Sequence, residues 1–164
     1  MKNLILVRHA KANIFAPDGK SDFYRELSDK GMEEAERISD NLIDKLPPAE
    51  IFLLSPATRT LQTFEIFKKK ISYTFSVQEE KIFYASEAKD ILEFIKGIPN
   101  DVETVWLFGH EPKLTEIIMS LSLSFDKAMS TCSIAFLKFD TISWLDISIK
   151  NLVDLQHYAP TDFE

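Results

Sequence analysis

The chain has 164 residues, of which 45% are hydrophobic and 27% are charged, a composition typical of one globular domain spanning residues 1–164. Its formal net charge of −7 at pH 7 argues against a broad surface for nucleic acid or an anionic membrane, since both need clustered Lys and Arg side chains. An acidic chain can still bind an anionic substrate where a few positive groups converge in one pocket.

Short apolar runs alternate with amphipathic stretches along the chain. The predicted strands, taken in chain order, are residues 2–8, 51–54, 82–84, 102–108, 132–139 and 144–152. The predicted helices, which carry apolar residues at helical spacing, are residues 28–46, 55–70, 87–96 and 112–121. Ser28 is a typical N-cap, and the Ser55-Pro56 pair predicts that a helix starts there. Residues 9–27 are irregular and polar, which indicates a loop.

Strands that alternate with helices indicate an α/β fold, in which helices cover both faces of one sheet. The last two predicted strands form a hairpin around Asp140 and Thr141, so one antiparallel strand is expected near the C-terminus of a mostly parallel sheet. No repeat or interdomain linker interrupts the pattern. We therefore predict a single three-layer α/β/α domain.

Cysteine content and hydropathy indicate the cellular compartment in which the protein is expected. The single cysteine, Cys132, excludes an internal disulfide and favours a reducing environment. It lies beside an apolar stretch, so we interpret it as a small core residue, with a reactive thiol as the alternative. The apolar run at residues 3–7 is too short for a signal peptide, and no run approaches the ~20 residues of a membrane helix. A cytoplasmic protein without a membrane partner is expected.

Arginine and histidine are scarce, so their positions are informative. Arg8 and His9 stand at the carboxyl end of the first predicted strand, Arg59 lies in the first turns after the second, and His110 follows the strand at residues 102–108. In an open α/β sheet the carboxyl ends of the strands form the ligand crevice. Each residue taken singly is explained by a solvated surface, but the set predicts one shared site.

Two His and two Arg side chains suit phosphoryl transfer. Arginine forks pair with phosphate oxygens, and a neutral imidazole nitrogen can attack phosphorus. A protonated imidazole can stabilise the charge on the phosphoryl oxygens. Neighbouring arginines lower the pKa of a histidine, so that a fraction of the imidazole stays neutral and nucleophilic. The predicted helix start at Ser55 adds free amides at the crevice. The set therefore fits a reaction that passes through a phosphohistidine.

Three motifs of the chain resemble those of a known family. Residues 6–11 (LVRHAK) are similar to the signature of the histidine phosphatase superfamily, which includes the cofactor-dependent phosphoglycerate mutases. Residues 55–63 (SPATRTLQT) resemble its second motif, and residues 109–112 (GHEP) its third. Residues 22–31 (DFYRELSDKG) resemble a segment of the small SixA-type phosphohistidine phosphatases.

The resemblance implies a role for each matching residue. His9 would be the phosphorylated nucleophile, Arg8 and Arg59 would bind the phosphoryl oxygens, and His110 would complete the pocket. Arg25 would reach the same pocket, with a salt bridge on the loop surface as the alternative. The histidines are widely separated and no Cys/His cluster exists, so neither a metal site nor a cofactor is expected.

A general acid is not evident. Larger members of the superfamily carry a Glu or Asp, on an insertion after the second helix, that protonates the leaving oxygen, whereas residues 76–86 are short and lack that acidic pattern. Glu111 is a possible acid, but an ionised carboxylate would repel phosphate unless its pKa were raised. We expect Glu111 to point away and orient a neighbour. This departure disfavours a mutase and favours a phosphoryl group displayed on a protein.

Three functions follow, and the first is the leading hypothesis. It is a cofactor-free phosphatase that removes phosphohistidine from proteins, so that the partner is a phosphorylated protein. The second is a phosphatase of small esters such as sugar phosphates or nucleotides. The third is a phosphate-binding module without turnover, against which the intact set of Arg8, His9, Arg59 and His110 argues.

Overall fold

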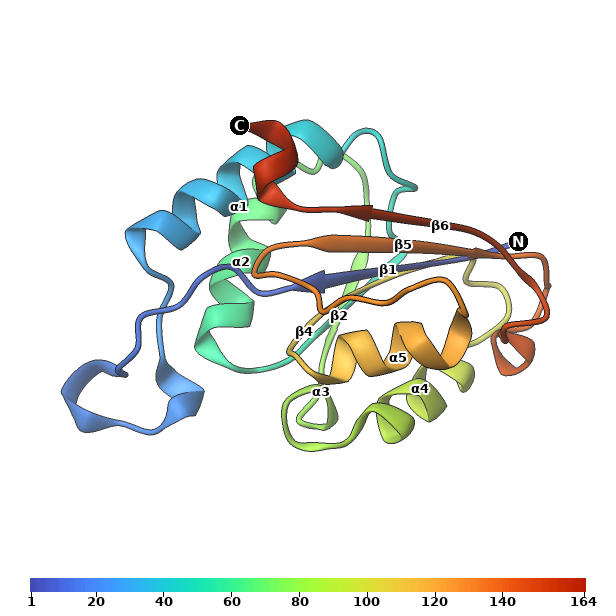
Figure 1. Cartoon of the computed structure of the whole chain (residues 1–164), viewed down its shortest axis with the longest axis horizontal. Coiled ribbons are helices and arrows are strands. Elements are labelled where there is room, and N and C mark those ends of the chain that lie inside the picture. Colours follow the sequence, from blue (N-terminus) through green and yellow to red (C-terminus); the bar gives the residue numbers. More distant parts are fainter.

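The computed structural model describes residues 1–164 and contains one six-stranded sheet (Figure 1). Its strands are β1 (Lys2–Arg8), β2 (Ile51–Leu54), β3 (Ser76–Glu79), β4 (Thr104–Gly109), β5 (Ile134–Phe139) and β6 (Leu152–Tyr158). Their order across the sheet is β3-β2-β4-β1-β5-β6. Strands β1 to β4 are parallel, and β5 runs antiparallel to both of its neighbours. The predicted sheet, mostly parallel with an antiparallel strand near the C-terminus, is confirmed.

Helices cover both faces of this sheet (Figure 1). The α-helices are α1 (Asp29–Leu42), α2 (Thr58–Lys68), α3 (Ile82–Ala85), α4 (Ala88–Lys96) and α5 (Lys113–Leu121). Helices α1 and α2 pack on one face, and α4 and α5 pack on the other. The predicted three-layer architecture is therefore confirmed. None of the helices combines the length and the apolar character that a membrane span requires.

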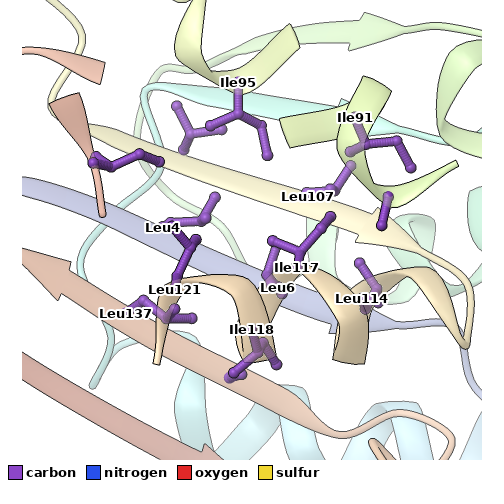
Figure 2. Packing of buried hydrophobic residues seen from close by; sticks show 14 of the residues in the cluster. Leu4, Leu6, Ile91, Ile95, Leu107, Leu114, Ile117, Ile118, Leu121 and Leu137 are labelled. Atoms are coloured by element: carbon purple, nitrogen blue, oxygen red, sulfur yellow. The ribbon is translucent and has the colours of Figure 1, made fainter. Parts of the chain in front are cut away.

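Strand β1 supplies side chains to two hydrophobic cores, because successive residues of a strand point to opposite faces. Leu4 and Leu6 pack with Ile117 of α5, as Figure 2 shows. Ile5 and Val7 face α1 and α2 instead. All five side chains are buried, and each contributes roughly 1.5–3 kcal/mol of apolar burial. This two-sided burial explains the continuous apolar run of β1 and fixes its carboxyl end in the middle of the sheet.

Two predicted strands are wrong. Residues 82–84 form helix α3, and the edge strand is β3, whose four side chains are all exposed and so give no apolar signal. Residues 144–152 are also not a strand. Trp144 begins a 3₁₀ turn, where its buried indole donates a hydrogen bond to the Val102 carbonyl oxygen at 2.7 Å, and the last strand is β6.

The loop after β1 is fastened to the start of α1. Ser28 is the N-cap as predicted, since its hydroxyl accepts a hydrogen bond from the Gly31 amide at 3.0 Å. The Ser28 amide and hydroxyl both donate to the Lys11 carbonyl oxygen, at 2.9 and 3.1 Å. Only glycine fits at position 31, because a Cβ there would lie 2.0 Å from that oxygen. These contacts hold the backbone just beyond His9.

Candidate active site

The carboxyl ends of β1, β4 and β2 lie side by side and carry the candidate residues. The His9 amide donates to the Gly109 carbonyl oxygen at 3.2 Å, which places His9 next to His110. The two imidazole rings are 5.3 Å apart between centroids. Arg59, in the first turn of α2, reaches His9 from the neighbouring segment. The convergence expected at this edge of the sheet is therefore present.

The hydrogen bonds of His9 define its tautomer. Its Nδ1 lies 2.7 Å from the Ala10 carbonyl oxygen, which can only accept, so Nδ1 carries the proton of the neutral ring. Nε2 then keeps its lone pair, to which Arg59 donates through Nε at 3.3 Å. Burial of the ring and the charges of nearby arginines outweigh the hydrogen bond to Ala10 and lower the pKa of His9 to about 4. At neutral pH Nε2 is thus an unprotonated nitrogen that is able to attack.

We expect nitrogen-15 NMR of labelled imidazoles to show this state directly. Because the pKa of His9 is lowered from 6.5 to about 4, its ring should stay neutral from pH 8 down to pH 5 and gain a proton only near pH 4. Throughout the neutral range Nδ1 should give the signal of a protonated nitrogen and Nε2 that of an unprotonated one. A titration near pH 6.5, or a proton on Nε2, would contradict this description.

Arg8 and His110 bring hydrogen-bonding atoms that have no partner within the protein. Arg8 donates through Nη1 to the Met129 carbonyl oxygen at 2.8 Å, but its Nε is buried and unpaired. The Nε2 of His110 lies 2.7 Å from Ser55 Oγ, whereas its Nδ1 is buried and unpaired. Burial, reinforced by the nearby positive charges, lowers the pKa of His110 to about 3. Buried polar atoms are normally paired, and an anionic oxygen can accept hydrogen bonds from both groups.

The buried side chain of Arg59 is bound by a carboxylate from the loop. Arg59 donates through Nη1 to the Asp22 carbonyl oxygen at 2.9 Å and through Nη2 to Asp22 Oδ2 at 3.1 Å. The same carboxylate accepts hydrogen bonds from Arg25 Nε at 2.8 Å and from the Tyr84 hydroxyl at 2.9 Å. Burial alone would raise the pKa of Asp22, but the hydrogen bonds and charges of these partners lower it to about 2. Asp22 is therefore ionised and joins the two arginines.

Arg25 and Glu111 form their hydrogen bonds with groups other than the imidazole of His9. Arg25 contacts Asp22 and donates through Nη1 to the Asn13 carbonyl oxygen at 3.0 Å, and its charge contributes to the lowered pKa of His9. Glu111 accepts hydrogen bonds from both the amide and the hydroxyl of Thr115. Both carboxylate oxygens of Glu111 are thus used by the first turn of α5.

Sequence reasoning gave no site role to the side chains of Asp22, Tyr84 or Ser55. The available signal for Asp22 was its opposite charge three residues before Arg25. Tyr84 was hidden because its segment was predicted as a strand. Ser55 was predicted to cap a helix, but α2 begins at Thr58. The hydroxyl of Ser55 accepts a hydrogen bond from the Ala57 amide at 3.3 Å and also lies 2.7 Å from His110 Nε2.

Comparison with known proteins shows which family and which structures this chain resembles. The family model of the histidine phosphatase superfamily (branch 1) matches residues 4–82. The structure of SixA from Agrobacterium tumefaciens, assigned as a phosphohistidine phosphatase, is 25% identical, with a TM-score of 0.77 and coverage of 94% of this chain and 97% of its own.

Two further structures share the fold at lower identity. The protein histidine phosphatase SixA complexed with tungstate is 20% identical, with a TM-score of 0.82 and coverage of 99% of both chains. A mycobacterial glucosyl-3-phosphoglycerate phosphatase is 13% identical, with a TM-score of 0.62 and coverage of 97% of this chain and 98% of its own. The similar structures thus include phosphatases of a protein and of a small ester, and together with the family model they support phosphatase activity.

Proposed function

We propose that this chain, which matches the histidine phosphatase superfamily model over residues 4–82, removes phosphoryl groups from phosphohistidine on proteins, with His9 Nε2 as the nucleophile. Nε2 attacks phosphorus, the P–N bond of the substrate breaks, and the leaving group departs as neutral imidazole because its other ring nitrogen already carries a proton. Water then attacks the phosphoryl group on His9, which releases phosphate and restores the free ring. Arg8, Arg59 and His110 bind the phosphoryl oxygens in both steps, so the proposal needs no cofactor.

Our choice of substrate rests on whether either of two nearby carboxylates, Asp22 and Glu111, can donate a proton to the leaving group. Expelling an alkoxide from an alkyl phosphate requires a general acid, which typically contributes 10²–10⁴ in rate. Asp22 is held ionised by Arg25, Arg59 and Tyr84, and both oxygens of Glu111 are bound by Thr115. Neither carboxylate is therefore ready to donate a proton. A phosphohistidine does not need one, because imidazole is a far weaker base than an alkoxide.

A phosphatase of small esters is the second candidate, and the position of Asp22 favours it. A phosphate group that draws Arg25 and Arg59 to itself weakens their hold on the Asp22 carboxylate and so raises its pKa. Asp22 would then become an acid only in the substrate complex. The shared fold with the glucosyl-3-phosphoglycerate phosphatase agrees with this alternative.

A survey of leaving groups separates the two candidates. We expect free phosphohistidine and activated aryl phosphates to be cleaved at least about a hundredfold faster than alkyl phosphates. Where phosphorylation of His9 limits the rate, rates on aryl phosphates should rise steeply as the leaving phenol becomes more acidic. The matched variants Asp22→Asn and Glu111→Gln should leave that steepness unchanged.

The small-ester candidate predicts a different pattern. Alkyl phosphates would then be cleaved as fast as phosphohistidine. In addition, either Asp22→Asn or Glu111→Gln would abolish the cleavage of alkyl phosphates alone.

A further inference from the structure

Two large apolar side chains stand exposed on the loop between β1 and α1. Ile14 keeps 81% of its surface in solvent and Phe15 keeps 84%. Their segment, residues 11–27, is called the β1–α1 arm here. It contains two 3₁₀ turns of its own, Pro17–Gly19 and Asp22–Tyr24, and it projects beyond the carboxyl ends of the strands as the blue segment in Figure 1. The arm therefore presents apolar surface on the side of the molecule that holds the candidate active site.

Hydrogen bonds tie the base of the arm to the candidate site. Ala12 and Leu27 form an antiparallel bridge across it. The carbonyl oxygen of Asn13, the residue before Ile14, accepts a hydrogen bond from Arg25. Arg25 binds the Asp22 carboxylate, which in turn binds Arg59 beside His9. Ile14 and Phe15 thus directly follow Asn13. The Asn13 backbone is connected to His9 by the hydrogen bonds of Arg25, Asp22 and Arg59.

Exposure by itself does not distinguish the arm. Ile142 is also 84% exposed, but it lies in the turn between β5 and β6. That turn follows Phe139, which pairs with Lys2 at the amino end of β1, so Ile142 lies at the opposite edge of the sheet. Isolated apolar residues on a surface are common, whereas an adjacent exposed pair beside a candidate site is typical of an interaction surface.

The position and charge of the arm indicate its occupant. A small phosphate ester would contact only the groups close to His9, whereas a protein that displays a phosphohistidine would also reach the arm beside them. The three basic and three acidic side chains of the arm cancel, although the whole chain carries −7. The arm can therefore receive apolar side chains of another protein without the repulsion that the rest of this acidic surface exerts on an acidic partner.

We propose that Ile14 and Phe15 form the docking contact for the protein that carries the phosphohistidine. This inference rests on the proposed function and adds the surface through which a protein substrate is chosen over a small one. The contact acts on substrate binding and leaves the phosphoryl chemistry at His9 unchanged.

The test compares two substrates that have the same leaving group. One is a folded protein phosphorylated on histidine with phosphoramidate, selected from several such proteins on the criterion that the wild type cleaves it faster than free phosphohistidine. The other is free phosphohistidine. In the double variant Ile14→Ser/Phe15→Ser we expect kcat/KM on the phosphoprotein to fall about tenfold, because two apolar contacts are lost. On free phosphohistidine it should stay within about twofold. The control Ile142→Ser, equally exposed at the other edge of the sheet, should change neither value.

Each other outcome has a defined meaning. A phosphoprotein rate that is unchanged in the double variant overturns the inference, as does an equal loss on both substrates, which would make the arm part of the phosphate pocket. A wild-type dimer that becomes monomeric in the double variant, seen by light scattering, would assign the pair to self-association instead. If the wild type cleaves free phosphohistidine but no histidine-phosphorylated protein, the proposed function itself fails.

Discussion

Replacing His9 by alanine is expected to abolish turnover, with kcat lowered by at least about four orders of magnitude. The unprotonated Nε2 is the only atom that the proposed reaction phosphorylates, and alanine offers no substitute. Arg59 would still bind phosphate, so affinity for inorganic phosphate should fall much less than kcat. Steady-state kinetics on an activated aryl phosphate and a phosphate inhibition constant measure the two effects separately.

The fold should survive this substitution. The His9 backbone accepts a hydrogen bond from the Cys132 amide at 3.0 Å and donates one to Gly109, and alanine keeps both. The thermal midpoint is therefore expected to stay close to that of the wild type. As a matched control, His157→Ala removes a half-buried imidazole from β6 and should leave turnover intact. Activity of His9→Ala within tenfold of the wild type would refute the nucleophile assignment.

The strands that were predicted correctly are those buried on both faces. Strand β1 reads as a continuous apolar run because α1 and α5 cover its two sides, and β4 is similar. Strand β3 lies at the edge of the sheet with every side chain exposed, so no periodicity marks it. Its place is set by backbone hydrogen bonds to β2, which local sequence does not encode.

The candidate site divides in the same way. Arg8, His9 and His110 were found because they stand at the carboxyl ends of buried strands, and the topology brings such positions together. Asp22 was missed because its position depends on how residues 9–27 fold back over the strand ends. The hydroxyl of Ser55 binds a local backbone amide, that of Ala57, and also His110, and this second partner comes from the neighbouring strand. The position of Asp22 and the histidine partner of Ser55 therefore depend on long-range contacts, which the local sequence pattern does not encode.

Replacing Arg59 by lysine is expected to lower kcat/KM by roughly two orders of magnitude, although the positive charge is kept. The guanidinium uses all three nitrogens: Nε donates to His9, and Nη1 and Nη2 donate to Asp22. One ammonium group cannot reproduce this planar arrangement. The loss should appear both in kcat and in the affinity for phosphate, because the same fork that orients the nucleophile would hold the phosphoryl oxygens.

Arg37→Lys provides the matched control for this prediction. Arg37 lies on α1 and donates through Nε to the Pro160 carbonyl oxygen at 3.2 Å, away from the candidate site. The same chemical change there should leave kcat/KM within about twofold of the wild type, since substitutions on a surface without function have small effects. Should Arg59→Lys also retain a near-normal rate, its charge alone would be sufficient. The geometry of the fork at His9 would then not be what stabilises the transferred phosphoryl group.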